Sequence, residues 1–117
     1  MIGIVLKILS EEEWERAKTQ GIFTGSTADI ADGFIHLSTP DQFAGTAEKY
    51  FRGQNDLVVT AFRTDDLGQN LKWEVSRGGD LFPHYYGNLP TDKALWTEAA
   101  SLDTDGIPIL PGKAFKC

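Results

Sequence analysis

The stretch DLVVTAFRTDDLGQNLKWEVS, residues 56–76, contains two predicted strands in succession. Residues 56–63 are rich in β-branched and aromatic side chains, which favours a strand. Residues 71–76 alternate between two faces, with Leu71, Trp73 and Val75 on one and Glu74 on the other. The connection TDDLGQN is typical of a turn. Because strands that follow one another without a helix are not βαβ units, this stretch indicates an α+β domain rather than a doubly wound α/β sheet.

Upstream of this stretch, the chain opens with a predicted strand and helix. Residues 2–8 (IGIVLKI) are apolar except for Lys7, which predicts a buried strand. In SEEEWERAKTQG, Ser10 and the glutamate three residues later form a capping box, and Gly21 suits the end of the helix. Trp14 and Ala17 are its expected buried side chains. Residues 24–33 are predicted to be a polar connection without regular structure.

A second strand and helix are predicted in the stretch beginning GFIHLSTPDQ. Residues 34–37 form the expected strand, and the helix has Thr39 as its N-cap with Pro40 at its first position. Its core-facing stripe follows helical spacing, and Gly53 is expected to end it. The stripe consists of Phe43, Ala47, Tyr50 and Phe51.

The last third of the chain is expected to be less regular. RGGD, residues 77–80, is a predicted turn, and LFPHYYGNLP, residues 81–90, has a proline near each end. Because proline lacks the amide donor of a central strand, we expect a loop or an irregular edge element there. Residues 92–99 fit either a strand or a helix, and we favour a strand with Ala94, Trp96 and Glu98 on one face. The tail from residue 103 is expected to wrap over the surface.

Composition bounds the class of protein. A chain of 117 residues with 41% hydrophobic side chains predicts a single domain over 1–117 with its own core. The net charge of −6 counts against nucleic-acid binding, which depends on Lys and Arg at phosphates. No apolar run is long enough to span a membrane, and the N-terminus lacks the features of a signal peptide. The only cysteine, Cys117, fits a reducing, cytoplasmic location.

His36 has two interpretations on the residues alone. It shares a strand face with Phe34 and Ser38, and the helix start at Ser38 and Thr39 offers backbone N–H groups to an anion. These groups together could form a ligand site at the mouth of a cleft. Alternatively, His36 is a satisfied structural histidine and Ser38 caps the helix.

The segment FPHYYGNLP also has two interpretations. His84 lies beside Tyr85 and Tyr86, and such rings can stack on a planar ligand while an imidazole or hydroxyl moves a proton. The alternative is an ordered loop whose tyrosines only pack. Glu74 taken alone is an ordinary solvated carboxylate, and Lys7 would normally extend its amine to the strand edge.

The motifs GFIHLS, LKWEVS and FPHYYG together resemble a family of small, mainly bacterial domains, the domain-of-unknown-function family 952. The resemblance extends from the opening strand to about Pro90. The family is thought to be related to the ADP-ribosyltransferase superfamily, whose members bind NAD in a cleft of a split, mostly antiparallel sheet. The resemblance therefore implies an ADP-ribosyltransferase-like fold with a split sheet and two short helices.

The resemblance also implies roles for particular residues. Lys7 stands where many relatives have a histidine, on the strand whose His or Arg often holds ribose hydroxyls in the superfamily. His36 would be the group that a second strand contributes. Glu74 or His84 would take the place of the glutamate that completes the site. In an NAD site, Tyr85 or Tyr86 would stack on nicotinamide, while Lys7 and His36 would hold ribose hydroxyls or phosphate. The expected catalytic residues are thus His36, Glu74 and His84, and the expected ligand contacts are Lys7, Ser38, Thr39, Tyr85 and Tyr86.

Three functions follow from these expectations. The first is an ADP-ribosyltransferase-like enzyme that uses NAD, or an ADP-ribosylated or phosphorylated substrate. The second is a catalytically silent module that binds a nucleotide or another small ligand, which Lys7 favours because lysine cannot act as a neutral imidazole. The third is a metal-dependent hydrolase using His36, His84 and Glu74, although no ligand spacing supports it and no metal is expected.

Overall fold

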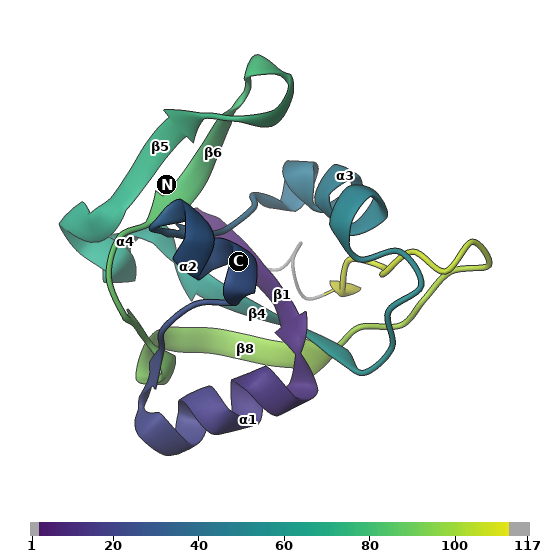
Figure 1. Ribbon diagram of the computed structural model, residues 1–117, viewed down its shortest axis with the longest axis horizontal. Helices are drawn as coiled ribbons and strands as arrows, with labels where there is room; N and C mark the ends of the chain where they lie inside the picture. Colours follow the sequence, from purple (N-terminus) through teal and green to yellow (C-terminus); the bar gives the residue numbers. More distant parts are fainter. Residues whose placement is uncertain (1–2, 113–117) are drawn as a thin grey trace.

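Three antiparallel sheets and four α-helices form an α+β fold in the part of the chain that the computed structural model describes, residues 3–112 (Figure 1). The α+β class predicted from the strand succession is therefore confirmed. The largest sheet has the order β1–β4–β8, and its strands are Ile4–Ser10, Leu57–Arg63 and Ala94–Ala99. All three strands were expected from the sequence, but Ile2 of the predicted first strand lies outside the described residues.

Strand β1 is apolar apart from Lys7 and Ser10, because both of its faces are buried. Val5 and Leu9 pack into one cluster with Trp14, whereas Leu6 and Ile8 pack into a second cluster with Phe43. A strand covered on both faces has no solvent side, so it shows no alternation of polar and apolar residues. Lys7 lies within this strand and is itself buried, so it needs a charged partner.

The two expected helices are present and begin with the expected caps, but the second has Phe51 as its C-cap and does not extend to Gly53. Helix α1, Glu11–Gln20, begins with the Ser10 capping box and ends at Gly21, whose φ of 82° suits glycine. Helix α3, Pro40–Tyr50, begins with the Thr39 capping box. The predicted stripe of α3 was wrong at its end, because the helix stops at Tyr50, which is exposed. Phe51 leaves the helix and packs partly against the core instead.

The prediction of a loop or an irregular edge element for residues 81–90 was wrong for residues 81–85. Residues Leu81–Tyr85 form strand β6, which is the central strand of the sheet β3–β6–β5. Its neighbours are β3, Ile35–His36, and β5, Leu71–Val75. Pro83 is tolerated because it faces the end of the two-residue strand β3, where its carbonyl still accepts from the Leu37 amide at 3.1 Å. Because β3 is so short, the amide that Pro83 lacks does not interrupt a long ladder of hydrogen bonds.

A third sheet pairs two very short strands, β2 and β7. They span Ile22–Phe23 and Leu89–Pro90. The predicted face of β8 was also wrong, because Ala94 packs against one core cluster and Trp96 against the other. The pairing with β4 skips Leu95, and such a bulge interrupts the alternation of faces.

The polar segment 24–33 contains a helix that the sequence analysis missed. Helix α2, Thr27–Asp32, begins with a capping box formed by Ser26 and Asp29 and ends at Gly33. A one-turn helix, α4, spans Thr64–Leu67 in the predicted turn. The expectation of two short helices was therefore incomplete. Helix α2 has only six residues, and Asp29 is its only buried one, so periodicity gave no signal for it.

The C-terminal tail is held to the body by apolar side chains. Ile107 and Leu110 pack against the second core cluster, and Leu102 forms a bridge with Pro108. Cys117 lies outside the described part of the chain, so the cytoplasmic location inferred from it stays a prediction. Among the described residues, no helix is long and apolar enough to cross a membrane.

Candidate functional site

Strands β3 and β6 place the two histidines side by side. His36 pairs directly with His84 in the antiparallel register, and their ring centroids are 5.7 Å apart. Residues that pair directly in a sheet point to the same face. The two histidines therefore belong to one surface, as a shared site requires.

Phe34 lies at the centre of this surface. Its ring stacks on His84 with centroids 4.0 Å apart, and it also contacts His36 at 4.7 Å and Tyr86 at 5.5 Å. The four rings form a continuous group, which we call the ring cluster: Phe34, His36, His84 and Tyr86. The ring cluster lies on one face of the sheet β3–β6–β5, and it offers a planar ligand the rings of Phe34, His36 and Tyr86, while His84 is buried beside Phe34.

Glu74 joins the ring cluster from strand β5. Its Oε1 accepts from His84 Nδ1 at 2.8 Å and from the Tyr86 hydroxyl at 2.7 Å. These hydrogen bonds, led by the one from His84, lower the pKa of Glu74, while the bond to Glu74 raises the pKa of Tyr86. The side chain of Glu74 is 41% exposed, and its Oε2 accepts no hydrogen bond within residues 3–112. The site thus holds an ionised, accessible carboxylate in a fixed position.

Asp29 is a residue that the sequence analysis missed, and it organises the other side of the site. Its Oδ1 accepts from the His36 amide at 3.0 Å and from His36 Nδ1 at 2.6 Å. Its Oδ2 contacts Lys7 Nζ at 2.8 Å and accepts from the Ser26 amide at 2.9 Å. Two signals pointed to it: the spacing Ser26-x-x-Asp29 of a capping box, and a lysine in a buried strand that needs an anion.

The contacts of Asp29 determine its ionisation. Burial alone would raise the pKa of Asp29, but the hydrogen bond from His36 and the charge of Lys7 outweigh it and lower the pKa well below its usual range. Burial lowers the pKa of Lys7, and the nearby Asp29 opposes this change. Asp29 is therefore a buried anion whose charge is matched by Lys7.

Lys7 does not reach a ligand in this arrangement. Its ammonium is buried and is held by Asp29 and by the His36 carbonyl at 3.0 Å. The expectation that Lys7 would extend to the strand edge was wrong, because the missed helix α2 supplies a carboxylate inside the fold. Lys7 positions Asp29 and β3, and it contributes to the site only through them.

His36 is fixed by carboxylates on both ring nitrogens. Nδ1 contacts Asp29, and Nε2 contacts the exposed Asp32 at 2.9 Å. By contrast, His84 Nε2 has no hydrogen-bond partner among the described residues. Both imidazoles are oriented by a carboxylate at Nδ1, and for His84 this single contact favours the proton on Nδ1.

The other expected ligand contacts lie outside the ring cluster. Ser38 is buried, with its hydroxyl 3.1 Å from that of Thr46, and the Thr39 hydroxyl caps α3 by accepting from the Gln42 amide. Tyr85 points to the opposite face of β6 and packs in the first core cluster. Tyr86 is thus the tyrosine of FPHYYG that the structure brings to the site.

The ring cluster does not have the form of a metal centre. Among residues 3–112, no three His, Cys, Asp or Glu side chains are arranged to hold a metal ion. His84 Nδ1 and both nitrogens of His36 already contact carboxylates. The geometry therefore gives no support to a hydrolase that uses His36, His84 and Glu74 as ligands.

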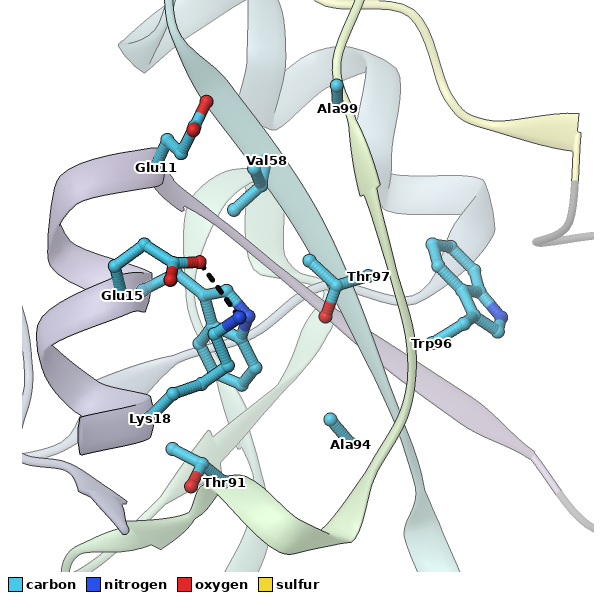
Figure 2. A pocket seen from close by; sticks show the side chains of 10 residues that line it. Glu11, Glu15, Lys18, Val58, Thr91, Ala94, Trp96, Thr97 and Ala99 are labelled. Atoms are coloured by element: carbon cyan, nitrogen blue, oxygen red, sulfur yellow. Dashed lines mark ion pairs between the residues drawn. The ribbon is translucent and has the colours of Figure 1, made fainter. Parts of the chain in front are cut away.

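A hollow of about 530 Å³ lies elsewhere in the fold, beside helix α1 and strand β8 (Figure 2). Trp14, Val58 and Thr97 line it, together with the ion pair between Lys18 and Glu15. None of its lining residues belongs to the ring cluster. Its size does not outweigh the chemistry of the ring cluster, because it contains no histidine and no buried charge.

The fold and the site define a small α+β domain whose split antiparallel sheet displays a His/Glu/Tyr/Phe surface. The sequence profile of the family of unknown function DUF952 matches residues 8–97, so the chain belongs to that family. The expected family is therefore confirmed. No curated protein matches the chain.

The fold agrees with solved structures of protein CC0527 from Caulobacter crescentus. Its crystal structure is similar with a TM-score of 0.88 and 50% identity, covering 91% of this chain and 93% of that chain. Its solution NMR structure gives a TM-score of 0.81 with 50% identity and 90% coverage of both chains. The α+β architecture is thus shared with a protein from a structural genomics programme.

Proposed function

We propose that the ring cluster binds NAD or a related nucleotide, and that the domain is an ADP-ribosyltransferase-like enzyme with Glu74 as its reactive carboxylate. The observation that carries this proposal is the position of Glu74: ionised, 41% exposed, and held by His84 and Tyr86 beside an aromatic surface. A planar base or nicotinamide would lie against the rings of Phe34 and His36.

The chemistry follows from this geometry. When the bond between nicotinamide and ribose breaks, its electron pair leaves with nicotinamide and the ribose acquires oxocarbenium character. An anion fixed beside that carbon stabilises the developing positive charge without having to reorganise. Glu74 meets this requirement, because His84 and Tyr86 hold Oε1 and leave Oε2 to the substrate. Water or an acceptor nucleophile then attacks the ribose carbon.

A second candidate is a silent nucleotide-binding module. It is favoured by the pairing of Lys7 and His36 with Asp29, since these contacts engage two groups that an enzyme of this type would direct at ribose hydroxyls. The two candidates differ in one measurement, the release of nicotinamide. Binding of NAD with no release would support the module and would contradict the enzyme.

Glu74→Gln tests the role of the carboxylate. Glutamine still accepts hydrogen bonds from His84 and Tyr86 but lacks the charge, so we expect nicotinamide release to fall by about 10²–10³-fold while NAD affinity changes little. Release is followed by chromatography and affinity by calorimetry. The matched control is Glu48→Gln, an exposed glutamate on α3. Equal loss of release in both variants, or no release by the unaltered protein, would overturn the assignment.

His36→Ala tests the aromatic surface. Removing the imidazole takes away one ring and one hydrogen-bonding group. We therefore expect the affinity for NAD and ADP-ribose to fall by about tenfold or more. Tyr50→Ala, which removes an exposed aromatic ring from α3, is the control. Circular dichroism of both variants checks that the fold is retained. Unchanged affinity in His36→Ala would place the ligand elsewhere.

A further inference from the structure

The hairpin of β5 and β6 has a free edge and an exposed apolar face. It projects from the body of the fold with β5 on its outer side (Figure 1), and β5 is the last strand of its sheet. Trp73 is 45% exposed, Val75 is 70% exposed, and Leu81, which pairs with Val75, is 54% exposed. A strand edge and apolar side chains exposed together are typical of a surface that pairs with another strand.

The hydrogen bonds of the hairpin show which backbone groups are free. The Ser76 amide donates to the Asp80 carbonyl, and the Tyr86 amide donates to the Asn70 carbonyl. Hydrogen-bonded pairs alternate with non-bonded pairs along an antiparallel ladder, so residues 72 and 74 also bond to β6. The amides and carbonyls of Trp73 and Val75 therefore point outward, to the free edge, together with the carbonyl of Leu71, whose amide already donates to the Gly68 carbonyl.

We propose that this edge binds a second copy of the chain, through antiparallel pairing of β5 with β5 about a two-fold axis at Trp73. The sequence Leu71-Lys72-Trp73-Glu74-Val75 is chemically self-complementary in that register. Trp73 lies opposite the partner's Trp73, and Leu71 lies opposite the partner's Val75. Their backbone groups point outward, apart from the Leu71 amide, so the hydrogen-bonded pairs of the new ladder coincide with the apolar side chains.

Charge complementarity favours a second copy over an unrelated strand. In the same register, Lys72 lies opposite the partner's Glu74, and Glu74 lies opposite the partner's Lys72. These are the non-hydrogen-bonded pairs, in which side chains approach most closely, and opposite charges at such positions stabilise the pairing. Shifting the register by two residues loses both ion pairs, because it opposes either Lys72 to the partner's Lys72 or Glu74 to the partner's Glu74.

The pairing also bears on the ring cluster, although it does not rest on the proposed function. Lys72 and Glu74 lie on the same sheet face as His84. The two-fold axis therefore continues this face across two copies and brings a lysine of the partner subunit to Glu74. The dimer has one six-stranded sheet with the order β3–β6–β5–β5–β6–β3.

Trp73→Pro tests the backbone pairing. The Trp73 amide is free of β6, so proline removes a donor from the dimer ladder and none from the hairpin. Trp73→Val, which keeps the amide and favours a strand, is the control. By sedimentation velocity we expect a dimer for the unaltered protein, a monomer for Trp73→Pro, and a weakened dimer for Trp73→Val. A monomeric unaltered protein, or a dimer that persists in Trp73→Pro, would overturn the proposal.

A mixing experiment tests the register. Lys72→Glu and Glu74→Lys each place like charges opposite one another in a homodimer, and we expect both variants to be monomeric. Mixed in equal amounts, they restore two opposite-charge pairs, so a heterodimer should form. A mixture that stays monomeric would contradict this register. Because Glu74 also binds His84, circular dichroism checks the Glu74→Lys variant, and the Trp73→Pro comparison does not depend on it.

Discussion

Replacing Asp29 with asparagine is expected to destabilise the protein by about 3–5 kcal/mol, because the change leaves the ammonium of Lys7 buried without its counter-ion. Asp29 is 2% exposed and contacts Lys7 at 2.8 Å. Removing one partner of a buried ion pair lowers the stability far more than replacing both partners with apolar side chains. The reason is that the remaining charge is still buried and keeps its desolvation penalty. Urea unfolding followed by circular dichroism measures the change in the free energy of unfolding.

Two further variants separate charge from other effects. Asp32→Asn removes a carboxylate that also contacts His36 but is exposed, and we expect a change below about 1 kcal/mol. The double variant Lys7→Met/Asp29→Asn removes both charges, so it should be more stable than Asp29→Asn alone. An Asp29→Asn protein as stable as the Asp32→Asn protein would show that Lys7 does not depend on Asp29.

Local rules predicted the parts of the fold that local chemistry determines. The capping boxes at Ser10 and Thr39 fix the starts of α1 and α3, because the side-chain hydrogen bonds involve residues three apart. Strands β4 and β5 were predicted from composition and alternation. These features depend on neighbours in sequence, so they needed no knowledge of the tertiary structure.

Other parts depend on contacts between distant residues, and the sequence did not reveal them. Pro83 argued against a central strand, yet it is acceptable because β3 ends where the missing amide would have been needed. The buried position of Asp29 depends on Lys7, 22 residues away, and on His36. The sequence analysis identified Lys7 as unusual, but it had no means of choosing a partner among 17 acidic residues.

The candidate site was predicted in part for the same reason. Strand periodicity placed Phe34 and His36 on one face, and the structure adds His84 and Tyr86 through the pairing of β3 with β6. Tyr85 was expected at the site but points to the core, because neighbouring residues of a strand face opposite sides. Once residues 81–85 are known to be a strand, only one of the two tyrosines can lie on the same face as His84.

Lowering the pH should remove the contribution of ionised Asp29 to the free energy of unfolding. The pKa of Asp29 is lowered in the folded protein, whereas in the unfolded chain it is about 3.9. Below about pH 4, the unfolded chain therefore binds a proton that the folded protein does not, and the free energy of unfolding falls as the pH falls. For this single group, the slope is about 1.4 kcal/mol per pH unit until the pH reaches the folded pKa.

The reference for this measurement is the Lys7→Met/Asp29→Asn variant, which has no ionisable group at either position. Subtracting its free energy of unfolding from that of the unaltered protein, from about pH 6 to about pH 2.5, cancels the titration of carboxylates such as Glu74 that both proteins share. We expect the difference to be steady above about pH 5 and to decline below about pH 4. A difference that stays flat throughout would mean that Asp29 is not an ion-paired carboxylate in the folded protein.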